Sequence, residues 1–265
     1  MTNDLAGARV LVTGSTQGIG LAVACAFAKL GASVVLHGLA DASTIANALD
    51  IVDKAGAASV RFEEADLRDP SAIDALMDRV GELEILVNNA GVQHTKSLAE
   101  TSREIWERIL AINLSAPFHT MRRVLPVMAS RGYGRVINIA SVHGLVASCN
   151  KGPYVAAKFG LVGLSRVAAL EYATAGSADT GGVTVNCICP GWTDTPMIGS
   201  QVAQRATLIG GSEADALTDL LTEKQPTRRL SSPDEIGALA VWLAARQAHN
   251  VTGAAIPIDG GWTAQ

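Results

Sequence analysis

Residues 9–20 read RVLVTGSTQGIG, a short apolar run followed by a glycine-rich turn, and residues 21–30 continue with a helical pattern. This order of strand, turn and helix predicts a pyrophosphate site, because the start of the helix offers free N–H groups and the positive end of its dipole. Gly14 permits the tight turn, Gly18 lets the backbone approach the pyrophosphate, and Gly20 lets helix and strand pack closely. The spacing is G-x-x-x-G-x-G rather than G-x-G-x-x-G, so the flanking strand and helix strengthen a prediction that the glycines alone would leave weak.

Strand-like apolar runs and helical patterns alternate along the whole chain. The runs are residues 9–13, 32–37, 60–65, 85–88, 135–141, 183–189 and 255–258. Such alternation predicts one α/β domain over residues 1–265, a Rossmann-type doubly wound parallel sheet of about seven strands. Ligands of such sheets bind at the carboxyl ends of the strands. We therefore expect the glycine turn, Asn88, Ser141 and Pro190 to converge on one crevice.

The composition argues against nucleic-acid, membrane and metal-binding roles. The formal net charge is −4 and no basic stripe is present, so no nucleic-acid partner is expected. No uncharged apolar run reaches the roughly 18 residues of a membrane span and the N-terminus lacks a signal pattern, so we expect a cytoplasmic protein without membrane contact. The spacing of Cys187 and Cys189 fits a buried strand better than a redox or zinc pair. No cluster has metal-ligand spacing, so no catalytic metal is expected.

The ends of the second and third strands bear on the choice of dinucleotide. Many dinucleotide-binding folds place an acidic residue after the second strand to bind the ribose 2′-hydroxyl, but that position holds Gly38 here. Neither this loop nor the glycine turn contains an Arg or Lys for a 2′-phosphate, so we expect NAD rather than NADP. Asp41 is interpreted as the cap of the next helix. Asp66 has two open interpretations: it accepts from the adenine amino group, or it caps the helix from Pro70.

A phenol and an amine share a helical pattern further along the chain. Tyr154 precedes Lys158 by four residues, a spacing that places both side chains on one helix face. A positive charge near a phenol favours the phenolate, so Tyr154 is a candidate general base, and Ser141 can hydrogen-bond the same substrate oxygen. By itself the pattern is better explained by two residues that merely share a helix surface, and only the other motifs reverse that judgement.

Six motifs stand in order at fitting separations. They are Thr13-Gly14-x-x-x-Gly18-x-Gly20, Asn88-Asn89-Ala90-Gly91, Asn113, Ser141, Tyr154-x-x-x-Lys158 and Pro190-Gly191. Together they resemble the short-chain dehydrogenase/reductase family, from about residue 9 to the C-terminus. The resemblance implies reversible hydride transfer between a secondary alcohol and a nicotinamide ring, with Tyr154 as general base or acid and Ser141 orienting the alcohol.

The same resemblance implies roles for further residues. Lys158 would lower the pKa of Tyr154 and hold the nicotinamide ribose, Asn113 would anchor a water linked to Lys158, and Thr195 would contact the carboxamide. Asn113 is also compatible with a helix kink or cap. The implied cofactor-binding residues are Gly14, Thr16, Gly18, Ile19, Gly20, Asp66, Leu67, Asn89, Ala90, Gly91, Tyr154, Lys158, Pro190, Gly191 and Thr195.

A second set of residues is similar to the D-3-hydroxybutyrate dehydrogenases, a group within that family. The matching segments are residues 92–95, 140–147, 150–151, 189–192, 223–226 and 259–264. This similarity implies NAD-dependent, reversible oxidation of a small anionic substrate, D-3-hydroxybutyrate, to acetoacetate in a homotetramer. The implied substrate-binding residues are Gln93, Ser141, His143, Lys151, Tyr154, Trp192, Gln201 and Trp262. Lys can bind a carboxylate as a point charge, while Gln and His donate directed hydrogen bonds.

Three segments interrupt or depart from the regular pattern. Residues 195–230 are expected to form a small helical lid over the substrate, broken at Gly210-Gly211. The Gly-rich residues 173–182 are expected to form a surface loop. Asp194 is expected to point away from the crevice, because an inward carboxylate would repel an acidic substrate.

Alternative interpretations remain open at this stage. Another short-chain reductase, such as an NADPH-dependent 3-oxoacyl reductase, shares the core motifs, and a cofactor-binding sensor without turnover is a more remote alternative. Gln93, His143 and Lys151 are also compatible with solvated loop residues. Trp192 and Trp262 are also compatible with core or subunit-interface packing.

Overall fold

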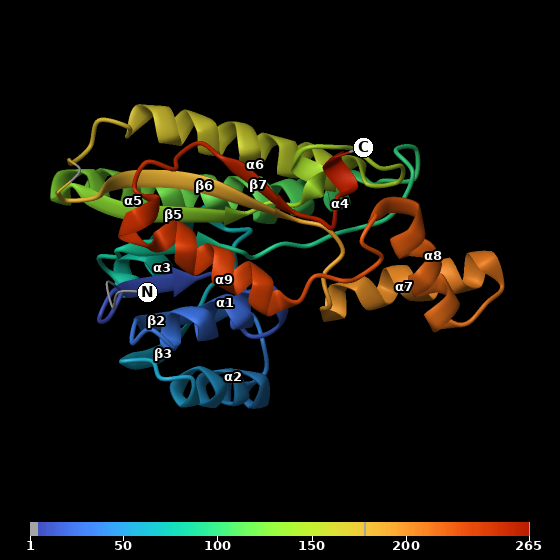
Figure 1. Ribbon diagram of the computed structural model, residues 1–265, viewed down its shortest axis with the longest axis horizontal. Helices are drawn as coiled ribbons and strands as arrows, with labels where there is room; N and C mark the ends of the chain where they lie inside the picture. Colours follow the sequence, from blue (N-terminus) through green and yellow to red (C-terminus); the bar gives the residue numbers. More distant parts are fainter. Residues whose placement is uncertain (1–4, 178, 265) are drawn as a thin grey trace.

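The computed structural model describes residues 5–177 and 179–264, and within these ranges one sheet of seven parallel strands runs through the centre of the molecule (Figure 1). The strands are β1 (Arg9–Val12), β2 (Ser33–Gly38), β3 (Ser59–Glu64), β4 (Ile85–Asn88), β5 (Tyr133–Ile139), β6 (Gly182–Pro190) and β7 (Ala255–Ile258). Their spatial order is β3-β2-β1-β4-β5-β6-β7, and every neighbouring pair is parallel. The strand order reverses between β1 and β4, as in a doubly wound sheet. The predicted fold class is therefore confirmed.

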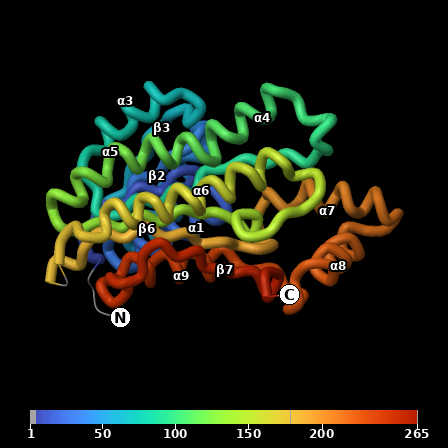
Figure 2. Tube along the Cα trace, turned by 90° about the horizontal axis from the view of Figure 1, so that it is seen from above, coloured from blue at the N-terminus to red at the C-terminus, as the bar shows by residue number. Residues whose placement is uncertain are grey.

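Helices cover both faces of this sheet. The α-helices in the described ranges are α1 (Gly18–Ala28), α2 (Ala42–Lys54), α3 (Pro70–Val80), α4 (Arg103–Leu110), α5 (Ala116–Arg131), α6 (Gly152–Glu171), α7 (Pro196–Ile209), α8 (Glu213–Lys224) and α9 (Pro233–Ala244). Short turns of helix are η1 (Ala111–Ser115), η2 (Val142–Gly144), η3 (Arg246–Ala248) and η4 (Trp262–Ala264). Figure 2 shows α3, α4, α5 and α6 on one side of the sheet and α1 and α9 on the other.

Strand β1 shows why the strands read as continuous apolar runs. Val10 and Val12 belong to a buried cluster that includes Phe27 of α1, whereas Leu11 belongs to a second cluster that includes Leu125 of α5. Successive side chains of a strand point to opposite faces, and here both faces are covered. Burial of each such side chain contributes roughly 1.5–3 kcal/mol. The two cores hold the carboxyl ends of the central strands in fixed positions.

The segment between β4 and β5 differs from its prediction. The sequence pattern predicts a helix over residues 97–110. Instead α4 begins only at Arg103, because the hydroxyl of Ser102 accepts from the Ile105 N–H and caps the helix there. Leu98 is consequently 77% exposed in the preceding turn. Asn113 lies in η1, a turn of π-helix that joins α4 directly to α5. Such turns place an extra residue in the helix and frequently occur at functional sites.

The segment that interrupts the strand–helix rhythm forms two helices. Helices α7 and α8 project from one end of the molecule (Figure 1). The break between them falls at Gly210, which adopts the left-handed conformation after α7, and Ser212 starts α8 with a capping box. The expected helical stretches with a break at Gly210-Gly211 are therefore confirmed.

The connection from α6 to β6 is a mostly exposed series of turns over residues 173–177 and 179–181. It ends beside a buried cation, since the Arg135 guanidinium donates to the carbonyls of Gly181 at 3.1 Å and Gly182 at 2.9 Å.

Cys187 and Cys189 are both buried on β6. None of the helices in the described ranges combines the length and hydropathy needed to cross a bilayer.

Candidate active site

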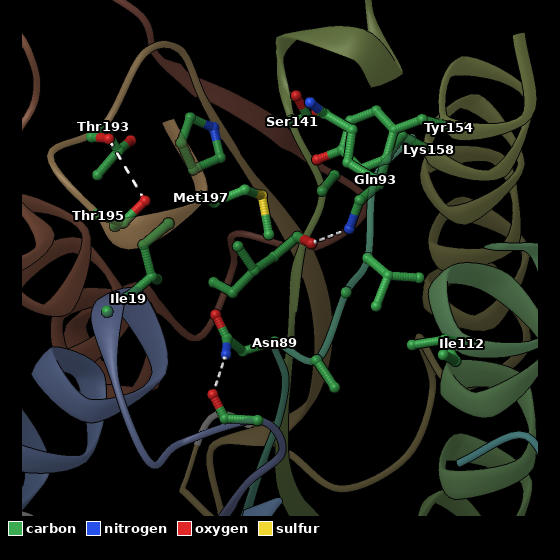
Figure 3. Close-up of a pocket in the computed structure, with 18 of the residues that line it drawn as sticks. Ile19, Asn89, Gln93, Ile112, Ser141, Tyr154, Lys158, Thr193, Thr195 and Met197 are labelled. Atoms are coloured by element: carbon green, nitrogen blue, oxygen red, sulfur yellow. Dashed lines mark hydrogen bonds between the residues drawn. The ribbon is translucent and has the colours of Figure 1, made fainter. Parts of the chain in front are cut away.

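A cavity of about 560 Å³ lies at the carboxyl ends of the central strands. This volume is within the range of small-molecule sites, roughly 300–1,000 Å³. The predicted catalytic, cofactor-binding and substrate-binding residues all line it except Gly20 and Asn113, which lie just behind its wall. Asn88, which was also expected at the crevice, does not line the cavity, because its buried side chain bonds Asn138 and Thr120 instead. Figure 3 shows Ser141, Tyr154, Lys158 and Gln93 together in one part of the cavity and Ile19 and Asn89 in another.

Two glycines allow backbone segments beside the cavity to pack closely. Gly14 has a φ of +62°, and a Cβ there would lie 2.8 Å from the Cα of Ala90. A Cβ on Gly20 would lie 2.3 Å from the Gly14 carbonyl oxygen. Any side chain at either position would push the turn after β1 away from the segment after β4 or from its own helix. The positive φ of Gly14 agrees with the tight turn predicted there, and the close approach at Gly20 agrees with the predicted packing of helix and strand.

The start of α1 fits an anionic group such as a pyrophosphate. Helix α1 begins at Gly18, and the preceding Gln17 provides no side-chain cap, so the first-turn N–H groups remain available to an anion. The Asn89 amide donates to the carbonyls of Thr13 at 2.9 Å and Gly14 at 2.8 Å, which ties the turn to the end of β4 (Figure 3). The donors and the space present therefore fit the phosphate half of a dinucleotide.

Asp66 pairs with a cation that the sequence interpretation overlooked. The Arg68 guanidinium donates to both oxygens of the Asp66 carboxylate, with distances of 2.6 to 3.0 Å. This pairing lowers the pKa of Asp66. Asp69, not Asp66, caps the helix that begins at Pro70, so the capping interpretation of Asp66 was wrong. The Asp41 cap is confirmed, since this carboxylate accepts from the Thr44 N–H at 2.9 Å.

Other lining residues were not singled out from the sequence, notably His37, Arg68 and Arg108. Arg68 lies two residues after Asp66 in the loop that follows β3, and Arg108 lies on α4. His37 stands directly before Gly38, and a polar residue at the end of a buried strand was the signal that could have drawn attention to it. Asp194 is exposed and absent from the lining, although Thr193 and Thr195 on either side of it belong to it. The expected outward orientation of Asp194 is thus observed.

Ser141, Tyr154 and Lys158 meet in a buried part of the cavity. The exposed fractions of the three side chains are 8%, 8% and 3%. The Lys158 ammonium lies 5.7 Å from the centre of the Tyr154 ring and donates to the Ile139 carbonyl at 2.7 Å. Helix α6 carries both residues on one face, as their spacing predicted.

Burial dominates the protonation of this group. It raises the pKa of Tyr154 to about 12, against the opposing effect of a hydrogen bond with Ser141. It also lowers the pKa of Lys158 to about 8. Lys158, which was expected to lower the Tyr154 pKa, is not among the groups that shift it here, and the loss of hydration dominates.

Asn113 holds the loop after β4 rather than facing the cavity. Its side-chain oxygen accepts from the Val92 N–H and its amide donates to the Val92 carbonyl, both at 2.8 Å. The side chain is fully buried. A Cβ built on Gly91 would lie 3.4 Å from this oxygen and 3.8 Å from the Lys158 nitrogen, so Asn113 and Lys158 approach the same glycine. Asn113 therefore lies in the helix kink, as one interpretation predicted, and it also lies close to Lys158.

A second cation lies at the other end of the substrate region. Lys151 is only 7% exposed, and its ammonium donates to the side-chain oxygen of Gln201 on α7 at 2.8 Å. The same ammonium lies 4.8 Å from the centre of a Trp192 ring, within cation–π distance. Burial lowers the pKa of Lys151 to about 8. A buried ammonium without a carboxylate partner favours the binding of an anion.

His143 lies between the phenol and the tryptophans. Its ring makes edge contacts with Tyr154 at 6.1 Å and with Trp262 at 5.4 Å between centroids. Burial, reinforced by the charge of Lys151, lowers its pKa to about 4. Nδ1 faces the Val146 carbonyl at 3.3 Å, and because a carbonyl only accepts, the neutral ring carries its proton on Nδ1 and offers Nε2 as an acceptor. Donation from Nε2 to a carboxylate therefore requires the imidazolium form.

Two tryptophans close this end of the cavity. The Trp192 and Trp262 rings are 5.4 Å apart between centroids. Trp192 also packs against the apolar side chains of α7 and α8, including Ile198 and Ala216.

In the described part of the chain, no group of three or more His, Cys, Asp or Glu side chains has the geometry of a metal site.

The molecule combines a doubly wound sheet with a glycine turn that fits a pyrophosphate, and a buried Ser–Tyr–Lys set lies in the same cavity. This combination defines an oxidoreductase that uses a dinucleotide. The family model described as enoyl-(acyl carrier protein) reductase matches residues 14–263. The chain is 43% identical over 259 residues to the D-beta-hydroxybutyrate dehydrogenase of Rhizobium meliloti, covering 96% of this chain and 98% of that protein. It is 45% identical over 265 residues to the enzyme of the same name from Cupriavidus necator, covering 98% and 100%.

Solved structures give the same result. The L-sorbose reductase of Gluconobacter frateurii, in complex with NADPH and L-sorbose, superposes with a TM-score of 0.91 at 29% identity over 100% of both chains. The chain belongs to the short-chain dehydrogenase/reductase family and is an alcohol dehydrogenase of that family.

Proposed function

We propose that this protein catalyses the reversible, NAD-dependent oxidation of D-3-hydroxybutyrate to acetoacetate. The observation that carries the proposal is the placement of two buried cations in one cavity. Lys158 accompanies Tyr154 and Ser141 where an alcohol would react, and Lys151 lies with Gln201 and Trp192 where a carboxylate would bind. The similarity to two D-beta-hydroxybutyrate dehydrogenases over nearly the whole chain supports the same substrate.

The chain's own residues act on the alcohol proton. Tyr154 accepts this proton in oxidation and returns it in reduction, and Ser141 holds the alcohol oxygen in line with the phenol. Lys158 stabilises the phenolate form of Tyr154. The proton is proposed to pass to solvent near Lys158, Gly91 and Asn113. A bound nicotinamide ring supplies the hydride acceptor or donor. These assignments rest on the geometry of the trio and on the family resemblance.

The carboxylate clamp is proposed to consist of Lys151, Gln201, Gln93 and His143. Lys151 neutralises the substrate charge, and Gln201 and Gln93 offer amide donors. The substrate carboxylate raises the pKa of His143, because it adds a negative charge beside a ring that burial and Lys151 hold neutral. Trp192 and Trp262 exclude water from the clamp, which strengthens each of these contacts.

Helix α7 brings Gln201 to the cavity, which supports a lid role for residues 195–230. The cavity is lined by Thr195, Met197 and Gln201 from this segment. Binding of a substrate carboxylate between Lys151 and Gln201 would then couple lid closure to substrate recognition. The residues proposed to contact the cofactor are those predicted from the sequence, with Asp66 in contact with the adenine.

The preference for NAD is supported by the loop after β2. Gly38 and Leu39 line the cavity there and carry no charge. Arg68, the cation that the structure places at this end, is already paired with Asp66. Among the described residues of the loops after β2 and β3, a 2′-phosphate would therefore meet no cation without breaking an ion pair.

Assembly as a homotetramer stays a prediction, as does a cytoplasmic location. Exposed apolar side chains on α4, α5 and α6 support self-association. They are Trp106, Phe118, Phe159, Val167 and Leu170. Large apolar side chains that are exposed on neighbouring helices are typical of subunit interfaces.

NADH formation tests this function. We expect rapid turnover of D-3-hydroxybutyrate with NAD, little with the L-enantiomer, and little with NADP. Activity confined to neutral or thioester substrates would contradict the substrate and favour a 3-oxoacyl reductase. Absence of turnover with any alcohol would favour a sensor that binds the cofactor without catalysis.

A further inference from the structure

His37 makes an unusual set of hydrogen bonds for a residue at the end of a strand. It is 2% exposed and lines the cavity. Its backbone N–H donates to the Ser15 hydroxyl at 3.0 Å, and its carbonyl accepts from the Ser15 N–H at 2.9 Å. Its ring nitrogen Nδ1 faces the Gly14 N–H at 3.3 Å, and Nε2 faces the Ala65 carbonyl at 3.2 Å. One residue thus joins the turn after β1, the end of β2 and the end of β3.

The partners of the ring permit only one protonation state. The Gly14 N–H can only donate, so Nδ1 must present a lone pair. The Ala65 carbonyl can only accept, so Nε2 must carry the proton. An imidazolium would direct an N–H of Nδ1 against the N–H of Gly14, and the opposite tautomer would fail at both contacts. Burial also lowers the pKa of His37 to about 4, which agrees with a ring that stays neutral at physiological pH.

The two contacts span the part of the cavity next to the pyrophosphate turn. Gly14 lies in this turn, and Ala65 is followed by Asp66 and Leu67, which line the same end of the cavity. Without an acceptor at Nδ1, the Gly14 N–H would lose its partner in a partly buried position, and the turn would rearrange to satisfy it. The separation between the turn and the β3 end therefore depends on this ring.

We propose that His37 is a positioning residue that holds the glycine turn and the β3 end at the separation required by the adenosine and pyrophosphate half of the dinucleotide. It acts through Gly14 and Ala65 rather than by touching the reacting atoms. The proposal depends on the dinucleotide site but not on the identity of the alcohol substrate.

Three substitutions separate the two contacts. Asn places its side-chain oxygen near the position of Nδ1, so His37→Asn retains an acceptor for Gly14 and loses the donor to Ala65. Gln reaches the position of Nε2, so His37→Gln retains the donor to Ala65 and loses the acceptor. His37→Phe removes both. His249→Asn, at an exposed histidine outside the cavity, is the matched control.

Calorimetric dissociation constants for NAD and ADP-ribose are the main measurement. We expect His37→Phe and His37→Gln to weaken both ligands about tenfold or more, because the partly buried Gly14 N–H loses its acceptor. We expect His37→Asn to stay within about threefold of wild type, and kcat at saturating cofactor to be retained in all three variants. Wild-type affinity in His37→Phe would overturn the proposal. Failure of the wild-type chain to bind NAD, NADP or ADP-ribose would instead overturn the dinucleotide site itself.

The tautomer gives a second test that needs no destabilised variant. Long-range ¹H–¹⁵N spectra of the wild-type imidazoles at neutral pH should show one ring with an unprotonated Nδ1 and a protonated Nε2. The signals of this ring should be absent from the spectrum of His37→Asn. A protonated Nδ1 on that ring would overturn the proposal even if the substituted proteins fail to fold.

Discussion

The ammonium of Lys151 donates a 2.8 Å hydrogen bond to the side-chain oxygen of Gln201, a residue 50 positions away on α7. This contact joins the start of the helix that carries Tyr154 to α7, which lines the cavity. Gln201 is neutral, so it satisfies a donor of Lys151 without compensating its charge. Because Lys151 is also buried, an anionic group that replaces Gln201 or joins it is strongly favoured.

Removal of this ammonium should weaken substrate binding more than chemistry. We expect Lys151→Ala to raise KM for D-3-hydroxybutyrate about 100-fold, since a hydrogen bond to a charged group contributes about 1.5–3 kcal/mol, and to change kcat less. Gln201→Ala should raise KM about tenfold. Steady-state kinetics with NAD measure both values.

Lys54→Ala, which removes an exposed lysine of α2, should leave the constants unchanged. A substrate without a carboxylate, such as 2-butanol, should lose little activity in Lys151→Ala. Equal losses with the acid and the neutral alcohol would contradict the clamp.

Removal of the phenol should abolish the chemical step. We expect Tyr154→Phe to lower kcat about 10³-fold, a magnitude typical of a lost general base or acid, while NAD still binds. Tyr172→Phe, at a half-buried tyrosine outside the cavity, is the control. Turnover by Tyr154→Phe at more than a tenth of the wild-type rate would exclude Tyr154 as the base.

The catalytic efficiency of oxidation should increase with pH. Burial holds the pKa of Tyr154 at about 12, so the phenolate is rare at neutral pH and becomes more abundant as pH rises. We therefore expect kcat/KM for oxidation to increase with pH from 6 to 9. Initial rates in overlapping buffers check this, and a profile that falls over this interval would be inconsistent with a phenolate base.

The cofactor preference should change when a cation is supplied after β2. Leu39 lines the cavity and is 61% exposed, so an arginine there can be accommodated without disturbing the core. We expect Leu39→Arg to increase kcat/KM with NADP at least tenfold relative to NAD, because an arginine can pair with a 2′-phosphate. Leu39→Gln, which adds polarity without charge, is the control. An unchanged ratio in Leu39→Arg would mean that another part of the cavity sets the preference.

Stability should fall as pH decreases from neutrality. Burial lowers the pKa of both His37 and His143 from 6.5 to about 4. Above about pH 6.5 both rings are neutral whether the chain is folded or unfolded. As pH falls from 6.5 toward 4, the unfolded chain binds protons that the folded chain does not, so the free energy of unfolding decreases, by about 2 kcal/mol per ring at pH 5.

Urea unfolding at pH 7.5 and pH 5.0 measures this decrease. His37→Asn should show a decrease about 2 kcal/mol smaller than wild type, whereas His249→Asn should match wild type. The same pH dependence in His37→Asn and wild type would contradict the contribution of His37.

The local motifs proved predictable because each is encoded by neighbouring residues. The glycine turn, the shared face of Tyr154 and Lys158, and the break at Gly210 follow from spacing and backbone preference alone. The start of α4 was missed because Ser102 satisfies the first N–H groups of the helix and so outweighs the helical pattern that precedes it. The cap at Asp69 was missed because Asp66, three residues earlier, was assigned the same role.

The remaining features depend on contacts between segments that are far apart in the chain. The order of apolar runs and motifs determined the doubly wound sheet and the residues that gather at its carboxyl edge, because burial on both faces leaves few other arrangements. Only the tertiary structure decided that Lys151 bonds Gln201 and that burial dominates the protonation of the Tyr154 phenol. Electrostatic effects of this kind depend on hydration and on distances of a few ångströms, which no spacing along the sequence specifies.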